Sequence, residues 1–114
     1  MKEYERKWLH QLDEVIHSNL NNPAFRLEHI AKELGISRAK LYRDIIKLTG
    51  VQPNAYIRKF RLEKAKEILE TGVYPTVKET AAVVGFRGAA YFAKIFFEEY
   101  KVSPSKLLRG ERKG

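Results

Sequence analysis

One segment of this chain occurs twice, about 50 residues apart, and the repeat restricts the folds that the sequence can adopt. The first copy covers residues 30–37 and the second covers residues 80–87, with one extra residue in the turn of the second copy, at Arg87 or Gly88. The matching pairs are Ala31/Ala81, Leu34/Val84, Gly35/Gly85, Ile36/Phe86, Leu41/Phe92, Arg43/Lys94, Ile45/Phe96, Val51/Val102, Pro53/Pro104 and Arg58/Arg109. Two copies are too few to stack as a solenoid. They suit a molecule that contacts two places on one long partner, for which DNA is the obvious candidate.

The 114 residues carry a net charge of +8, and the positive charge is unevenly distributed. Residues 37–61 hold seven Lys or Arg residues and only one acidic residue, Asp44. A solvated helix face could have the same composition. Because the basic segment begins just after the repeated motif, however, the sequence favours a polyanionic partner, above all nucleic acid.

Composition argues against several other classes of protein. The sequence has no run of 18 apolar residues, and its charged N-terminus leads into an amphipathic segment rather than a signal-peptide core. It has no cysteine, so it offers neither a disulfide framework nor a thiolate metal site. We therefore expect a cytoplasmic protein made of one compact domain or two small subdomains.

Apolar residues recur at helical spacing along the chain and nowhere alternate with the period of a strand, so the sequence predicts an all-α fold. The predicted helices cover residues 5–20, a short segment around 27–34, about 38–48, 53–71, a segment after Thr76, about 88–100, and a last short helix from Ser103-Pro104 through Leu108. We group them as a first helix-turn-helix subdomain at residues 1–52, a linker helix at 53–71 and a second subdomain at 72–114. The tail from Gly110 to Gly114 is expected to be frayed.

Local signals mark the helix ends. Gly35 predicts a left-handed residue in the tight turn, and Ser37 predicts an N-cap for the helix that follows. Pro53 is expected in the first turn of its helix. Thr76, with Glu79 three residues later, has the spacing of a capping box.

The second helix of a helix-turn-helix enters the major groove, and residues near its N-terminus contact base edges. In the first copy the candidate DNA-binding residues are Arg38, Ala39, Lys40, Tyr42, Arg43 and Lys47. Arginine can bind guanine O6 and N7 together, and alanine can meet a thymine methyl group. We therefore expect this copy to provide most of the base specificity.

The second copy offers different chemistry at the equivalent positions. Its candidate DNA-binding residues are Arg87, Gly88, Ala89, Ala90, Ala93 and Lys94. Three alanines form few hydrogen bonds, so this helix is expected either to read methyl groups and shape or to anchor the DNA backbone. The sequence leaves these two roles open.

The chain resembles the DNA-binding domain of the AraC/XylS family of bacterial transcription regulators. The densest match lies in residues 81–86, 91–96 and 102–105, residues 61–69 resemble the linker helix of that family, and the whole match covers about residues 5–109. The resemblance implies two helix-turn-helix units joined by a rigid helix, with recognition helices in successive major grooves of double-stranded DNA.

The chain departs from the family pattern in three respects. Lys101 stands where glycine is usual, which predicts a strained turn before Val102. Alanines replace the usual polar residues at positions 89, 90 and 93. Ile45 and Ile46 replace an aromatic residue, and this region resembles family members at the C-termini of hybrid two-component sensors.

Two other classes of function compete with DNA binding. His10, Asp13, Glu14 and His17 share a helix face at a spacing that could hold a metal. We interpret them as a solvated polar face, and with no catalytic motif present we expect no enzyme, catalytic residue, cofactor or bound metal. An all-α basic adaptor that binds an acidic protein or a membrane surface remains possible, but it leaves the repeat unexplained.

The expected partners are double-stranded DNA and RNA polymerase at a promoter, with no membrane. The chain is expected to be either the C-terminal piece of a larger regulator, with a sensor, receiver or dimerisation domain attached, or a stand-alone member of the family. The sequence does not reveal the operator, the inducing signal, the oligomeric state or whether transcription is activated or repressed.

Overall fold

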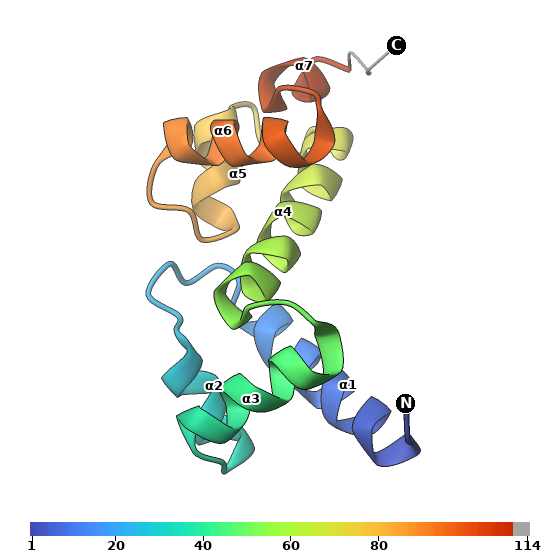
Figure 1. Ribbon diagram of the computed structural model, residues 1–114. Helices are drawn as coiled ribbons and strands as arrows, with labels where there is room; N and C mark the ends of the chain where they lie inside the picture. Colours follow the sequence, from blue (N-terminus) through green and yellow to red (C-terminus); the bar gives the residue numbers. More distant parts are fainter. Residues whose placement is uncertain (111–114) are drawn as a thin grey trace. The chain divides into compact units, whose positions relative to one another are not determined.

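The computed structural model describes residues 1–110, which form seven α-helices (Figure 1). No strand occurs among these residues, so the all-α prediction is confirmed. The helices are α1 (Glu3–Ser18), α2 (Leu27–Leu34), α3 (Arg38–Thr49), α4 (Pro53–Thr71), α5 (Val77–Val83), α6 (Ala89–Tyr100) and α7 (Pro104–Leu108). Apart from Gly110, the tail that we expected to be frayed lies outside the described residues.

The chain folds as two compact units, and their boundary lies inside a helix. The first unit contains residues 1–20 and 24–60, and the second contains residues 21–23 and the described residues from Arg61 onward. The boundary therefore divides α4 between Phe60 and Arg61. We predicted residues 53–71 as a separate linker, whereas each half of this helix contributes side chains to the core of one unit.

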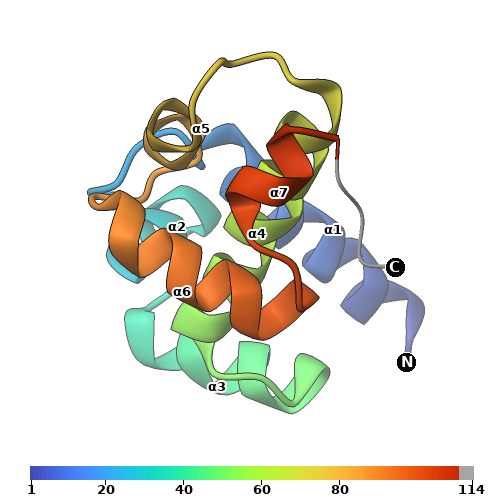
Figure 2. The ribbon, with the colours of Figure 1, turned by 90° about the horizontal axis from the view of Figure 1, so that it is seen from above.

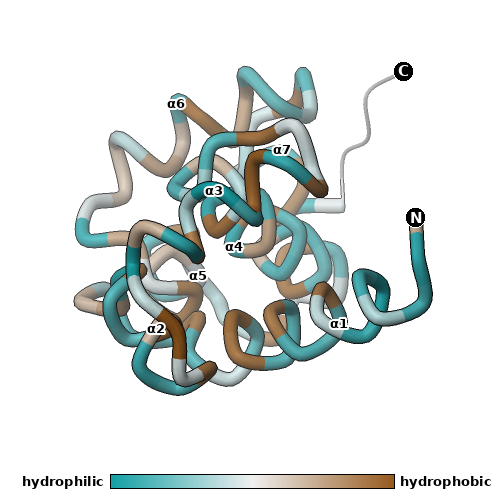
Figure 3. Tube along the Cα trace, turned by 60° about the horizontal axis from the view of Figure 1, so that its bottom comes forward, coloured by the Kyte–Doolittle hydropathy of each residue, from teal (hydrophilic) through white to brown (hydrophobic). Residues whose placement is uncertain are grey.

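The first unit packs α1, α2, α3 and the first half of α4 around one apolar core. Along α1, hydrophobic and hydrophilic segments alternate around the turns of the helix (Figure 3). One face of the helix is therefore buried, as the spacing of Leu12 and Ile16 predicts. The fully or almost fully buried members of the core are Leu12, Ile16, Leu20, Phe25, Leu27, Ile30, Ala31, Leu41, Ile45 and Ile57. Leu34 and Leu48 are only half-buried.

The second unit is built around aromatic rings. Successive ring centroids lie 5.1 Å apart for Phe86 and Phe92, 5.5 Å for Phe92 and Phe96, and 4.7 Å for Phe96 and Tyr100. Leu62, Ala65 and Leu69 of α4 and Ala81, Val84 and Leu107 complete the buried cluster. The helices α5, α6 and α7 contact one another, and α7 follows α6 after a short turn (Figure 2).

The predicted helix ends are largely those of the structure, with corrections at α5 and at the start of α1. The Thr76 hydroxyl accepts the Glu79 amide at 3.0 Å, as predicted for an N-cap. The Glu79 carboxylate, however, accepts a hydrogen bond from that same hydroxyl at 3.0 Å, instead of returning to the Thr76 amide as in a capping box. In addition, α1 begins at Glu3, two residues before the predicted start, because the Glu5 carboxylate accepts the Lys2 amide at 2.8 Å.

Candidate nucleic-acid interface

The turn between α2 and α3 has the geometry that the sequence predicted. Gly35 has φ of +68°, the left-handed region that favours glycine. The Gly35 amide donates to the Lys32 carbonyl at 3.2 Å, and the Ile36 amide donates to the Ala31 carbonyl at 3.0 Å. Ser37 then caps α3, because its hydroxyl accepts the Lys40 amide at 3.0 Å. The turn thereby sets the first residues of α3 at the protein surface.

The turn between α5 and α6 repeats the same hydrogen bonds. Gly85 has φ of +90°, its amide donates to the Ala82 carbonyl at 3.0 Å, and the Phe86 amide donates to the Ala81 carbonyl at 2.9 Å. The extra residue therefore enters after this shared turn, so that Gly88 rather than Arg87 precedes the first residue of α6. Because the backbone bonds coincide, α3 and α6 are equivalent helices of two copies of one motif.

The predicted residues of α3 fall into two groups. Arg38, Ala39, Tyr42 and Arg43 are exposed, as base-contacting side chains must be. The Tyr42 hydroxyl donates to the Gln52 side-chain oxygen, which restrains the ring beside the start of α4. These four residues therefore form an exposed surface near the N-terminus of α3.

Lys40 and Lys47 lie on the flank of α3 that faces α1. The Lys40 ammonium forms an ion pair with Asp44 at 2.7 Å, and all three residues border a hollow of about 450 Å³. The other wall of the hollow includes Trp8 of α1. Lys47 follows Arg43 by four residues, so it lies on α3 between that arginine and the hollow.

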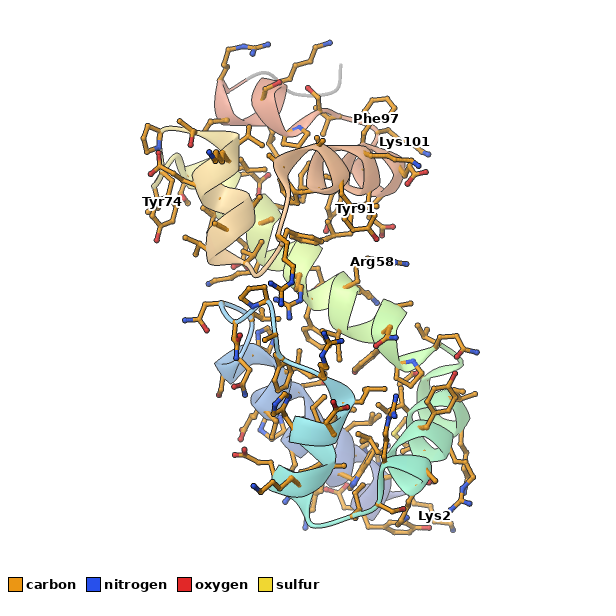
Figure 4. The ribbon with its side chains drawn as sticks, turned by 90° about the vertical axis from the view of Figure 1, so that its left-hand side faces the viewer. Lys2, Arg58, Tyr74, Tyr91, Phe97 and Lys101 are labelled. Atoms are coloured by element: carbon orange, nitrogen blue, oxygen red, sulfur yellow. The ribbon has the colours of Figure 1, made fainter. Side chains whose placement is uncertain are left out.

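In the second unit the predicted residues lie at the start of α6. Arg87, Gly88, Ala90 and Lys94 are exposed, and Ala89 and Ala93 are half-buried. Two aromatic side chains of α6 that we had not singled out are also exposed, Tyr91 by 53% and Phe97 by 51%. They project from different sides of the helix (Figure 4).

Arg61 belonged to the predicted basic segment, but it is buried rather than available to a ligand. It is 7% exposed, and its guanidinium donates to the Val84 carbonyl at 2.8 Å and to the Asn22 carbonyl at 3.2 Å. Burial lowers the pKa of this guanidinium. The spacing contained the signal, because Arg61 lies four residues from both Ile57 and Ala65, which are buried.

The polar face of α1 does not assemble a metal site. Among the described residues no group of three or more His, Cys, Asp or Glu side chains could hold a metal ion. Asp13 accepts a hydrogen bond from the Tyr56 hydroxyl at 2.7 Å, and the His17 ring packs edge-on against Phe60 at 4.8 Å. His10 contacts Glu14 at 2.6 Å at the surface. Two of these four side chains therefore serve packing within the first unit.

Across the part of the chain that the structure describes, no helix combines the length and apolar character needed to span a bilayer.

Comparison with known proteins agrees with the geometry of the two motifs. A family model described as a helix-turn-helix domain matches residues 30–110. A segment of histidine kinase P4 from Formosa agariphila is 32% identical over 92 residues, which are 81% of this chain and 7% of the kinase. The Msm operon regulatory protein of Streptococcus mutans is 31% identical over 104 residues, which are 91% of this chain and 37% of that protein. This chain thus spans well under half the length of these curated relatives.

The structural match points to the same family. The crystal structure of a probable AraC family transcriptional regulator from Rhodopseudomonas palustris superposes with a TM-score of 0.77 and 27% identity, covering 91% of this chain and 96% of the other. Together with the family model, which covers most of the chain, this match shows the class of domain. The domain is not an enzyme, because AraC-type domains are regulators of transcription. The chain belongs to the AraC-type family of helix-turn-helix DNA-binding domains.

Proposed function

We propose that this chain binds specific sequences of double-stranded DNA for a bacterial transcription regulator, with α3 and α6 each inserted in a major groove. The observation that carries the proposal is the duplicated turn. Both copies use the same left-handed glycine and the same two backbone hydrogen bonds to present the N-terminal part of a 12-residue helix. The adaptor alternative gives this duplication no role.

The candidate contacts differ in kind. Arg38 and Arg43 are exposed, and each can bind guanine O6 and N7 together. Arg58 and Lys59 are exposed on α4 and suit phosphate contacts. Lys40 is partly neutralised by Asp44, so we assign it to the rim of the interface rather than to base reading.

The wider setting is part of the proposal. RNA polymerase at a promoter is the expected partner, and the cytoplasm is the expected compartment. A sensor, receiver or dimerisation domain is expected in the same regulator, because this chain matches only 7% and 37% of two curated relatives.

The first test is the salt dependence of DNA affinity. In vitro selection with the 114-residue chain should yield a preferred duplex. If about five cations neutralise phosphates, the slope of log K against log salt, measured by fluorescence anisotropy, should be about −4.5. Random duplex should bind at low salt with a similar slope but lower affinity. Negligible affinity for every duplex at low salt, or a flat salt dependence, would contradict DNA binding.

A further inference from the structure

We infer that the second unit recognises thymine 5-methyl groups through an apolar stripe on α6 made of Ala90, Ala93 and Phe97. This inference rests on the proposed DNA-binding function and specifies what one of its two motifs recognises. It also adds Phe97 to the residues that determine specificity.

The three side chains lie on one side of the helix. Residues separated by three, four and seven positions share a helical face, and these are the spacings that join Ala90, Ala93 and Phe97. Ala90 is exposed, Ala93 is half-buried and Phe97 is 51% exposed. Together they form a continuous apolar strip that begins at the N-terminal turn of α6.

The repeat places this stripe where the first unit carries its candidate base contacts. At an offset of 51 residues, Ala90 corresponds to Ala39 and Ala93 to Tyr42. The same offset matches Phe97 with Ile46, which is half-buried one turn beyond Tyr42. The same surface of the motif is therefore presented twice, and in α6 it lacks hydrogen-bonding side chains.

The unit does not need the Phe97 ring for its core. The buried rings are its neighbours in the helix, Phe92 and Phe96, which are both 0% exposed. Leaving about half of a large aromatic side chain in water forgoes part of its transfer free energy. A side chain in this position gains that free energy when a partner covers it.

Charge around the stripe favours DNA as that partner. Lys94 lies beside the stripe, and Arg87 is exposed just before the helix. Glu99 lies about 200° around the helix from Phe97 and so leaves this face, whereas Glu98 follows Lys94 by four residues and lies on the same flank of the stripe as that lysine.

Thymine is the base that matches an apolar surface in the major groove. Its 5-methyl group is the only methyl that an unmodified base pair presents there. Opposite a G·C pair, the stripe would cover donors and acceptors without replacing their hydrogen bonds to water. The stripe should therefore select thymines in the half-element that α6 contacts.

Deoxyuridine tests this directly, because it differs from thymidine only by the methyl group. In the selected duplex, each thymine of the second half-element is replaced by deoxyuridine, one at a time, and anisotropy gives the affinity of the 114-residue chain. Loss of one contacted methyl should weaken binding about fourfold. At the same positions, 5-methylcytosine paired with guanine should bind more tightly than cytosine.

Variants then assign the effect to Phe97. Phe97→Ala should weaken binding to the thymine duplex. It should also reduce the deoxyuridine penalty, which is the loss of affinity when thymine is replaced by deoxyuridine, to less than about twofold. Phe97→Lys should remove the penalty while strengthening binding to all duplexes at low salt, because it adds a phosphate contact. Tyr91→Ala, an equally exposed aromatic on another side of α6, is the matched control and should keep the full penalty. Circular dichroism melts confirm that each variant is folded.

The outcomes separate this inference from the proposed function. If the wild-type chain binds DNA specifically and with salt dependence but shows no deoxyuridine penalty, thymine recognition is overturned and DNA binding stands. A penalty that persists in Phe97→Ala would remove Phe97 from the stripe and suggest that its ring contacts a protein. Absence of binding to any duplex would instead overturn the proposed function itself.

Discussion

The helices α3 and α6 have the same length and follow the same turn, yet they present opposite chemistry. Each has 12 residues. Of these, α3 carries four basic residues and one acidic residue, whereas α6 carries one basic and two acidic residues. The backbone hydrogen bonds of the turn fix where the helix lies, and they leave its exposed side chains free to differ. In this chain one motif suits polar and charged contacts and the other suits apolar contacts.

The two units also differ in how their backbone is held. Ser37 caps α3 with its hydroxyl, whereas α6 begins after Gly88, which has no side chain to cap it. At the other ends, Gly50 and Lys101 both adopt left-handed φ, of +72° and +58°. The second unit additionally depends on a buried guanidinium. Three pairs of variants test these differences, from the largest expected effect to the smallest.

Arg61→Met should reduce the free energy of unfolding by about 3 kcal/mol, because it leaves the Val84 and Asn22 carbonyls without the guanidinium donors. Urea unfolding followed by circular dichroism measures the loss. Arg58→Met, on the same helix but exposed, is the control and should change stability by less than about 0.5 kcal/mol. Equal effects at both positions would show that the buried hydrogen bonds contribute little.

Arg43→Ala and Lys94→Ala substitute equivalent positions of α3 and α6, and they should differ in kind. Arg43→Ala should cost about 1–3 kcal/mol of binding free energy on the preferred duplex and relax the preference at one base pair. Lys94→Ala should weaken all duplexes by a similar factor and reduce the salt slope by about 1, because a lone lysine beside alanines suits a phosphate. In vitro selection of bound duplexes with each variant distinguishes base reading from phosphate contact. A changed sequence preference for Lys94→Ala alone would reverse the two roles.

Lys101→Gly should stabilise the protein by about 1 kcal/mol, because glycine adopts a positive φ without the clash that a Cβ atom causes. Gly50→Lys, the reciprocal change in the first unit, should destabilise by about the same amount. A Cβ atom at Gly50 would meet no atom within 4 Å, so that loss would come from the backbone alone. Thermal melts of both variants test the pair, and changes of the same sign would contradict this account.

The sequence was most informative where structure is local. Gly35 and Ser37 could be assigned from residue type and position alone, because left-handed turns and N-caps depend on a few neighbouring residues. The bounds of α4 were predicted for the same reason, since Pro53 starts the helix and Gly72 follows its end. These signals were sufficient for the fold class and for the position of both recognition helices.

The sequence was less informative where the answer depends on distant segments. The hollow that Lys40 and Lys47 border could not be predicted without knowing that α1 lies beside one flank of α3. Arg61 looked like one more member of a basic cluster, because its carbonyl partners are 39 and 23 residues away in the sequence. Phe97 was overlooked because it sits next to Phe96, and residue type alone does not show which of two adjacent phenylalanines is buried. The DNA-binding role of each candidate residue remains a prediction.

The left-handed lysine at the end of α6 also bears on how much of the protein a cell contains. Backbone strain of about 1 kcal/mol corresponds to a roughly fivefold larger unfolded population at equilibrium. Unfolded chains are the substrates of cellular proteases, and changes of this size can alter protein abundance several-fold. Position 101 therefore offers a way to set the steady-state amount of a regulator, and hence the occupancy of its operators, without altering any candidate base contact.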